Sequence, residues 1–383
     1  MIYLDNGATS FPKPASVTES VRNAMRYSGG SPGRGGHKNT LKAGETVFKT
    51  RELLGEMFSC ESEGVIFTDN CTTAINMAVK GVCRKGDIIL TSTLEHNSVL
   101  RPLVKLEEKG IISFETVRIN PLNDDDTVNN FRKAMSKNVR AVVCTFASNV
   151  FGTVLPIQRI GRLCKEQGVI FIVDGAQAAG ALSIDMKRMN IDILCLPGHK
   201  GLYGPMGTGL MLLSGRVMPE ELTQGGTGSF SMEKEQPLVI PDRYESGTLN
   251  YPGIAGLCSG VEFIRACGGE KTIHQWETEL VKVLENDLSV IKGVKLFPHM
   301  KSSVCAPILS FNIGHRHSEE VSALLDKHNF AVRAGYHCAR LAHENYGTAE
   351  KGCVRVTPGF FNSKKDIKNF VFCCNKIALG KKM

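Results

Sequence analysis

Residues 169–200 read VIFIVDGAQAAGALSIDMKRMNIDILCLPGHK. Two short apolar runs lie in this segment, Val169–Val173 and Ile191–Leu196, and each is followed at once by polar residues and glycine. Runs of this length and composition predict strands buried on both faces, as in a parallel sheet covered by helices. The polar residues after them are the first candidates for a functional site, because ligands of such sheets bind beyond the carboxyl ends of the strands.

Strand-like and helix-like segments continue to alternate on both sides of residues 169–200. Further strands are predicted at Asp87–Ser92, Ala141–Ala147 and Gly209–Leu213. Amphipathic segments predict helices at Thr73–Val82, Ser98–Glu108, Asn129–Ser136 and Ile157–Glu166. We expect Asn97 or Ser98 to cap the second of these helices and Pro156 to start the fourth. The alternation indicates an α/β fold with a mainly parallel sheet.

The alternation of strand-like and helix-like segments ends after about residue 250. Two long helical patterns are followed by short strand-like runs and a terminal helix, at Ile254–Ala266, Thr272–Ile291, Ala306–Ile313, Ala331–Val332 and Lys364–Ile377. This order indicates a second, smaller α+β domain. We predict a large domain over residues 15–250 and a small domain over residues 251–383, which also includes residues 1–14.

The composition narrows the class of protein. The chain has 383 residues, 42% of them hydrophobic, so it can bury a large core. Lys and Arg exceed Asp and Glu by 46 to 38, but the basic residues are scattered, so we expect no nucleic-acid partner. We find neither a membrane-spanning apolar segment nor a secretion signal, and we therefore expect a soluble, cytoplasmic protein.

Thirteen cysteines are the most unusual feature of the composition. Without an export signal the thiols should stay reduced, and no pair has the C-x-x-C spacing, so we expect no disulfide framework and no metal site. Most should be small buried hydrophobic residues, with one or more reactive thiols among them. Those in apolar strand or helix patterns are assigned to the core: Cys144, Cys164, Cys195, Cys258 and Cys373.

Polar residues follow each predicted strand of the first domain. They are Glu95-His96-Asn97, Ser148-Asn149, Asp174-Gly175-Ala176-Gln177 and Gly198-His199-Lys200, and Asp69-Asn70-Cys71-Thr72-Thr73 precedes the first helix. The start of that helix offers free backbone N–H groups to an anion. With a carboxylate, an imidazole and a lysine, it predicts a site for an aldehyde cofactor that carries a phosphate and a pyridine ring. Dinucleotide binding is the competing interpretation, but no G-x-G-x-x-G occurs.

The motifs Asp174-Gly175-Ala176-Gln177 and Gly198-His199-Lys200 resemble those of the class V aminotransferase family, in particular its cysteine desulfurase and selenocysteine lyase branch. The resemblance covers nearly the whole chain, from Tyr3-Leu4-Asp5-Asn6-Gly7-Ala8-Thr9 to Val354-Arg355-Val356-Thr357-Pro358-Gly359. It implies an aspartate-aminotransferase-like, PLP-dependent transferase fold, with a large seven-stranded, mainly parallel sheet domain and a smaller C-terminal α+β domain. It also implies pyridoxal 5'-phosphate as cofactor and a homodimer.

The resemblance also implies roles for single residues. Lys200 would form the Schiff base with the cofactor and shuttle the Cα proton, for which an amine of lowered pKa is suited. Asp174 would face the pyridine nitrogen, Gln177 the phenolic oxygen, and His96 the ring face, where it also serves in proton transfer. The phosphate would be held by Thr72, Thr73, His199 and, from the other subunit, Thr248.

For the substrate the resemblance implies Asn149, which also borders the cofactor, and Arg355, which would bind the carboxylate through two contacts. Arg34 and His37 match a segment that approaches the partner's site in relatives, and they are equally well explained as solvated loop residues.

Two residues depart from the family pattern. Pro197 stands where close relatives carry Ser, which removes one phosphate contact, and Gly201 lengthens the loop after Lys200. We therefore expect weaker cofactor binding.

Cys338 stands where the family has its persulfide-forming cysteine, in Arg333-Ala334-Gly335-Tyr336-His337-Cys338-Ala339. Independently of the resemblance, this segment is polar, and His337 and the arginines favour the thiolate. Cys71 is interpreted as a small-residue substitution rather than a redox residue, and Cys353 as structural. We expect a short, partly ordered loop after Cys338.

The implied reaction converts L-cysteine to L-alanine and leaves a persulfide on Cys338, whose sulfur would pass to an acceptor protein and into iron–sulfur clusters or other sulfur-containing cofactors. Two alternatives stay open. One is a selenocysteine lyase. The other is a class V aminotransferase without desulfurase activity, or a cofactor-poor protein that binds a partner.

Overall fold

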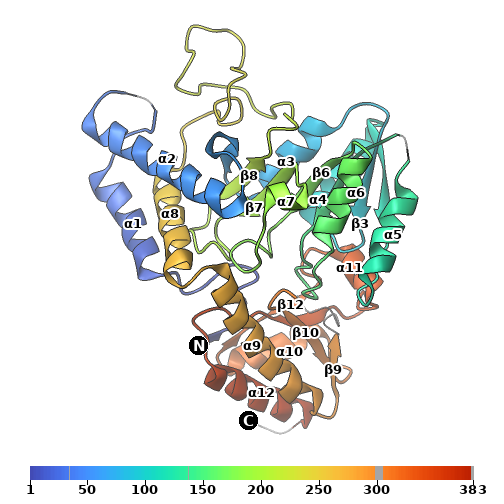
Figure 1. Cartoon of the computed structure of the whole chain (residues 1–383). Coiled ribbons are helices and arrows are strands. Elements are labelled where there is room, and N and C mark those ends of the chain that lie inside the picture. The colour runs from blue at the N-terminus through green and yellow to red at the C-terminus, as the bar shows by residue number, and fades with distance from the viewer. Residues whose placement is uncertain (34, 137, 298–304, 381–383) are drawn as a thin grey trace.

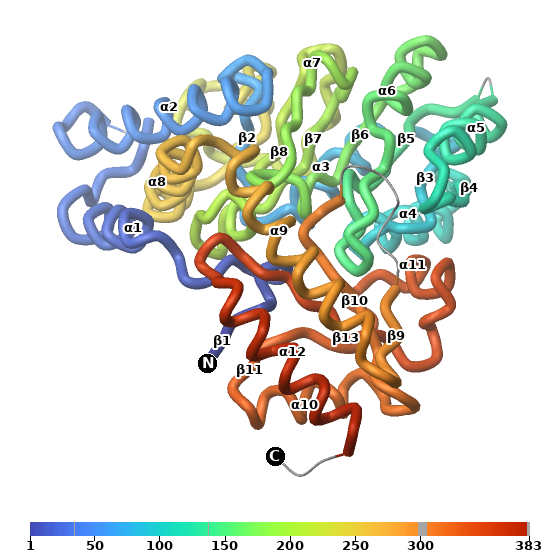
Figure 2. Tube along the Cα trace, turned by 60° about the horizontal axis from the view of Figure 1, so that its bottom comes forward, coloured from blue at the N-terminus to red at the C-terminus, as the bar shows by residue number. Residues whose placement is uncertain are grey.

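The computed structural model of the chain describes residues 1–33, 35–136, 138–297 and 305–380. Within these ranges a seven-stranded sheet lies in the upper part of the molecule (Figure 1), and its strand order is β2-β8-β7-β6-β5-β3-β4 (Figure 2). β8 runs antiparallel to both of its neighbours, and all other pairs are parallel. The strands are β2 (Val65–Thr68), β3 (Asp87–Ser92), β4 (Ile112–Val117), β5 (Val139–Thr145), β6 (Ile170–Asp174), β7 (Ile193–Pro197) and β8 (Gly209–Leu213). The predicted α/β fold with a mainly parallel seven-stranded sheet is confirmed.

Helices cover both faces of this sheet. Along β5, Val142 and Cys144 belong to one core, and Ala141 and Val143 belong to the core on the opposite face. This double burial explains why the strands read as continuous apolar runs. Helices α3 (Cys71–Val82) and α4 (Asn97–Glu108) cover one face, and α2 (Lys38–Phe58), α5 (Asp124–Ala134), α6 (Ile157–Glu166) and α8 (Tyr251–Ala266) cover the other. The remaining helices of this part are α1 (Ala15–Tyr27), η1 (Ser62–Gly64) and α7 (Met186–Met189).

A second, antiparallel sheet follows in the C-terminal part, with the order β12-β13-β10-β9. Its strands are β9 (Val294–Phe297), β10 (Leu309–Ile313), β12 (Arg333–Gly335) and β13 (Cys353–Val356). Helices α9 (Glu270–Ser289), α10 (Ser318–Lys327) and α12 (Lys364–Ala378) share a hydrophobic core with this sheet. The short helix α11 (Arg340–Asn345) lies in the chain between β12 and β13.

The N-terminal segment lies with these C-terminal elements. β1 (Ile2–Tyr3) pairs parallel with β11 (Phe330–Ala331), and Figure 2 shows the two strands side by side. Asp5 and Thr357 form an isolated bridge just beyond them. The N-terminal segment therefore packs with C-terminal elements, in a separate two-stranded sheet with β11. The boundaries predicted for the two domains stay a prediction.

The start of α5 and the cap of α4 differ most from the sequence prediction, and α3, α4, α8 and α9 begin one to three residues before the predicted helices. α5 begins at Asp124 rather than Asn129, because Asn123 Oδ1 accepts hydrogen bonds from the next backbone N–H groups and three aspartates occupy the first turn, where the helix dipole favours them. The cap of α4 is neither Asn97 nor Ser98 but His96, whose side chain accepts from the backbone N of Ser98. Pro156 does start α6, as predicted.

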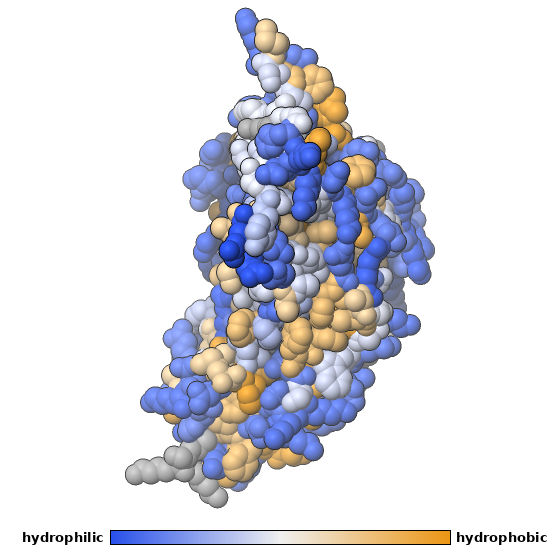
Figure 3. Space-filling view, turned by 90° about the vertical axis from the view of Figure 1, so that its left-hand side faces the viewer, coloured by the Kyte–Doolittle hydropathy of each residue, from blue (hydrophilic) through white to orange (hydrophobic). Residues whose placement is uncertain are grey.

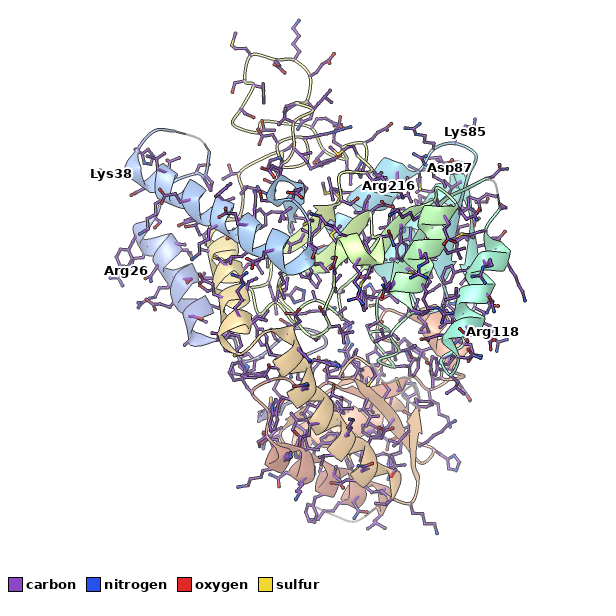
Figure 4. The ribbon with its side chains drawn as sticks, viewed as in Figure 1. Arg26, Lys38, Lys85, Asp87, Arg118 and Arg216 are labelled. Carbon is purple, nitrogen blue, oxygen red and sulfur yellow. The ribbon has the colours of Figure 1, made fainter. Side chains whose placement is uncertain are left out.

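The surface carries basic side chains on many separate elements. Figure 4 labels Arg26 on α1, Lys38 at the start of α2, Lys85 before β3 and Arg118 after β4, and these residues lie apart from one another. In the part of the chain that the structure describes, no helix combines the length and apolar character needed to cross a membrane.

Candidate active site

The carboxyl ends of four neighbouring strands border one cavity of about 180 Å³. His96 follows β3, Asn149 follows β5, Asp174 ends β6 and Lys200 follows β7. The cavity is lined by Asn70, Cys71, Thr72, His96, Ser98, Thr145, Ala147, Asn149, Asp174, Ala176, Gln177, Pro197, His199 and Lys200. The structure therefore brings together most of the residues that the sequence predicts to hold a cofactor.

Lys200 lies between this cavity and a second one of about 50 Å³, which it also lines. Burial lowers the pKa of Lys200, and the negative charge of Asp174 opposes that shift. A lowered pKa increases the share of neutral amine, which is the nucleophilic and basic form. The next residue must be glycine, because a Cβ on Gly201 would lie 2.1 Å from the carbonyl oxygen of Ala179.

Asp174 is almost fully buried, and its Oδ1 accepts two hydrogen bonds. Ala176 N donates at 2.9 Å and Cys71 Sγ donates at 3.5 Å. Cys71 is the first residue of α3, and burial raises its pKa well above the usual range, so it stays a thiol. Cys71, interpreted from the sequence as a small-residue substitution, thus contacts the carboxylate at the centre of the site.

The N-terminus of α3 also opens at the cavity. Asn70 caps it by accepting a hydrogen bond from Thr73 N at 2.9 Å. Thr72 Oγ1 lies 2.7 Å from Ser98 Oγ, which in turn lies 2.8 Å from His96 Nδ1. Burial is the main cause of a lowered pKa of His96, so the ring is largely neutral at pH 7. Thr72 and His96 therefore belong to one chain of hydrogen bonds at this edge of the sheet.

The backbone of His199 is held by the N-terminal segment. Thr9 Oγ1 and Lys13 Nζ donate to its carbonyl oxygen at 2.9 and 2.7 Å, and Ser10 Oγ donates to the carbonyl oxygen of Lys200 at 2.8 Å. Burial lowers the pKa of His199 to about 4. Its Nδ1 is buried with no hydrogen-bond partner among the described residues, so the ring retains an unused polar atom beside the cavity.

Arg355 reaches the site from β13 of the second sheet. Its Nη2 donates to Asp5 Oδ1 at 2.6 Å, and its Nη1 donates to the carbonyl oxygen of Asn149 at 2.8 Å. The Nε of this buried side chain has no partner in the described ranges. Gln177 Nε2 donates to the Gly7 carbonyl oxygen at 3.0 Å. Arg355 and Gln177 thus tie the N-terminal segment to the site.

Several predicted residues lie outside the cavity around Lys200. Thr73 and Thr248 line a neighbouring cavity of about 460 Å³, and Thr248 is exposed. His37 is exposed at the start of α2. Arg34 lies outside the described residues. Within one chain, Thr73, Thr248 and His37 therefore do not line the cavity around Lys200.

Cys338 occupies a turn held against the site by two hydrogen bonds to its carbonyl oxygens, one from a backbone N–H and one from a side chain. Asn97 N donates to its carbonyl oxygen at 2.8 Å, and Asn149 Nδ2 donates to the carbonyl oxygen of His337 at 2.7 Å. His337 and Cys338 have φ values of +50° and +56°, a left-handed conformation uncommon for residues with a Cβ. α11 begins two residues after Cys338, so the segment after Cys338 contains a short helix where a short, partly ordered loop was predicted.

All thirteen cysteines lie within the described ranges, and Cys338 alone among them is exposed. The five cysteines assigned to the core from the sequence are buried, and so is Cys353. The assignment of the five cysteines to the core is confirmed, and the structural role of Cys353 stays a prediction. Exposure therefore separates Cys338 from every other thiol of the chain.

Three polar residues beside the site have no role assigned from the sequence: Asp5, Lys13 and Glu95. Glu95 is buried beneath the cavity, where it accepts hydrogen bonds from Ser92 Oγ and from Thr145 N. Burial raises its pKa to about 8. Their partners stand up to 350 positions away in the chain, so no local pattern predicts these contacts. The sequence offers one indication of their role, which is that each residue lies beside or within a quoted motif.

Comparisons with known proteins agree with this geometry. The profile of the class V aminotransferases matches residues 2–370. A protein of Methanothermobacter thermautotrophicus named "Probable cysteine desulfurase" is 30% identical, over 96% of this chain and 92% of its own length. One of Pyrococcus abyssi with the same name is 29% identical, over 97% and 92%. The apo structure of a cysteine desulfurase from Thermococcus onnurineus superposes with a TM-score of 0.91 at 28% identity, covering 99% of this chain and 95% of that one.

Proposed function

The chain belongs to the class V aminotransferase family, and we propose that it is a pyridoxal-phosphate-dependent cysteine desulfurase that converts L-cysteine to L-alanine. One observation supports desulfurase activity in particular, beyond membership of the family. The only exposed cysteine of the described chain, Cys338, lies in a turn that Asn97 and Asn149 hold against the cavity containing Lys200 and Asp174. The cavity offers an amine and a carboxylate, and the adjoining turn offers an accessible thiol; these are the groups that this reaction requires.

The residues around the cavity fit the cofactor. When bound, pyridoxal phosphate supplies an aldehyde that links to amines and a ring that accepts electrons. Lys200 would hold the aldehyde, and Asp174 would keep the ring nitrogen protonated. The unpaired Nδ1 of His199 and the N-terminus of α3, including Thr72 and Thr73, would meet the phosphate. His96 would lie against the ring, and Gln177 would turn from Gly7 toward the phenolic oxygen.

Lys200 is suited to move the proton of the substrate Cα. Its lowered pKa provides the neutral amine that accepts this proton, and the same group returns it to the product. Arg355 would bind the substrate carboxylate, because its Nε has no partner among the described residues. The guanidinium would then contact both this carboxylate and Asp5. Asn149, which contacts both Arg355 and His337, would border the substrate from the side of Cys338.

Cys338 performs the sulfur transfer in this proposal. Its thiolate attacks the substrate sulfur, so that an S–S bond forms and the C–S bond breaks. The electron pair of the broken bond stays with the three-carbon skeleton, which takes up a proton and leaves as alanine. The persulfide on Cys338 would then pass its outer sulfur to an acceptor, for iron–sulfur clusters or other sulfur-containing cofactors.

We also infer a homodimer in the cytoplasm. Large hydrophobic residues of α1 and α2 are exposed, among them Met25, Tyr27, Leu41 and Phe48. In Figure 3, which views the molecule from the side where α1 and α2 lie, hydrophobic residues alternate with hydrophilic ones on the surface. Thr248 is exposed and does not line the cavity of its own Lys200, which supports a role at the partner's site. Sedimentation equilibrium should give twice the mass of one chain.

Two measurements test the activity. Purified protein given L-cysteine and a reductant should release alanine and sulfide in equal amounts, and Cys338→Ser should abolish sulfide release while the half-buried control Cys60→Ser keeps it. Borohydride should fix the cofactor on Lys200, as peptide mass spectrometry would show. Full sulfide release by Cys338→Ser would refute the role of Cys338, and a rate on L-selenocysteine that survives in that variant would favour a selenocysteine lyase.

A further inference from the structure

His337, His343 and Cys353 form a buried cluster beside the turn that carries Cys338. One ligand atom from each residue, a ring nitrogen or the sulfur, lies within 4.8 Å of the other two. The side chains are 4%, 1% and 0% exposed. They come from three elements, since His337 follows β12, His343 lies on α11 and Cys353 begins β13 opposite Gly335. The fold thus brings together three side chains of the types that bind metals, although their spacing in the sequence matches no metal-binding motif.

Each histidine of the cluster keeps one ring nitrogen without a hydrogen-bond partner among the described residues. These are His337 Nδ1 and His343 Nε2. The other nitrogens have contacts, because His343 Nδ1 lies 2.7 Å from Thr348 Oγ1 and His337 Nε2 faces the Arg333 carbonyl oxygen at 3.5 Å. Two unpaired nitrogens in a dry interior are unfavourable unless a ligand binds them. An outer hydrogen bond on the opposite nitrogen is how proteins orient histidines toward a metal.

The chemistry of the three side chains limits the ion that they can bind. Two imidazoles and a sulfur suit zinc or copper, whereas magnesium, calcium and manganese prefer carboxylate and carbonyl oxygens. Burial lowers the pKa of His337 to about 2 and also lowers that of His343, so both rings are neutral at pH 7. The Cys353 thiol would release its proton as the metal binds. Burial raises the pKa of this thiol to about 12, and the positive charge of Arg355 opposes that rise.

We propose that His337, His343 and Cys353 form a binding site for a thiophilic metal ion, Zn²⁺ or Cu⁺. Such ions lie about 2.0–2.3 Å from nitrogen and sulfur ligands, so the three atoms must close in by up to roughly 1 Å. The bound ion would join the Cys338 turn to α11 and β13. This proposal does not depend on the reaction proposed above.

Metal retention tests the site directly. Cys338→Ser is the parent, because it removes the exposed thiol that would bind metal by itself. After treatment with a chelator, loading with Zn²⁺ and dialysis, this parent should retain one Zn²⁺ per chain, and X-ray absorption should show two nitrogen ligands and one sulfur ligand. A parallel anaerobic titration with Cu⁺ against a coloured competing chelator shows which ion binds more tightly.

Matched variants locate the ion. In the parent, His343→Ala and Cys353→Ala should each weaken binding at least tenfold, while His328→Ala and Cys374→Ala in the same part of the fold should leave it unchanged. Failure of the parent to retain either ion would overturn the proposal, and so would ligands without sulfur. X-ray absorption is measured on the Cys338→Ser parent. It therefore shows which ligands bind the ion even if His343→Ala or Cys353→Ala does not fold.

Discussion

Arg355 and Asp5 stand 350 positions apart and form an ion pair of 2.6 Å in which the guanidinium is almost fully buried. The pair joins β13 to the N-terminal segment, and that segment in turn holds the backbone of His199 and Lys200 through Thr9, Ser10 and Lys13. The first residues of the chain therefore connect the second sheet to the site in the first.

Asp5→Asn should destabilise the protein, because it leaves the buried guanidinium of Arg355 without its carboxylate. Breaking a buried pair from one side costs about 3 kcal/mol. A lower urea midpoint would show the loss. Glu19→Gln, which removes the exposed pair with Arg22, should leave the midpoint unchanged. Equal midpoints for the two variants would show that the Asp5 pair does not stabilise the fold.

Glu245→Gln should have a comparable effect on the segment that carries Thr248. Glu245 pairs with Arg51 at 2.5 Å, and both side chains are buried. Its other oxygen accepts from Phe67 N at 2.7 Å. The glutamine keeps the second contact and loses the charge, so we expect a loss of about 3 kcal/mol in the free energy of unfolding. Glu262→Gln, which breaks the exposed pair with Lys49, serves as the control and should change little.

Glu95 should make the stability depend on pH between about 4.5 and 8. Burial raises its pKa to about 8 from 4.5, so the native protein keeps a proton that the unfolded chain has already lost in this window. The contribution of Glu95 is therefore fully present below pH 4.5 and is lost as the pH rises through 8.

Glu95→Gln removes this dependence. The free energy of unfolding of the variant, measured with urea and compared with that of wild type, should rise between pH 5 and pH 8 by up to about 4 kcal/mol. The exposed control Glu52→Gln should run parallel to wild type. Parallel curves for Glu95→Gln and wild type would mean that Glu95 is ionised in the native protein.

Cys338 should react with iodoacetamide before any other thiol, because it alone is exposed among the thirteen cysteines. Burial raises the pKa of Cys60 and of Cys83 to about 12, so these half-buried thiols should react far more slowly at pH 8. Mass spectrometry of the native protein should find one alkyl group, at Cys338. Faster labelling at Cys60 would contradict the exposed turn.

The interior of the first sheet could be predicted because its strands are buried on both faces and so appear as apolar runs. β3, β8 and α6 have the predicted bounds. β4 was not predicted, since it lies at the edge of the sheet and buries only its first and last residues. The antiparallel direction of β8 was also not predicted, because apolar content does not record strand direction.

The sequence by itself determined which chemical groups follow the strands, and it therefore predicted His96, Asn149, Asp174 and Lys200 around one cavity. This was possible because neighbouring parallel strands end at the same edge. Only the tertiary structure decided that Asp5 pairs with Arg355 and that Cys353 meets His337 and His343. Those contacts join segments placed by the packing of two sheets, and no spacing along the chain encodes them.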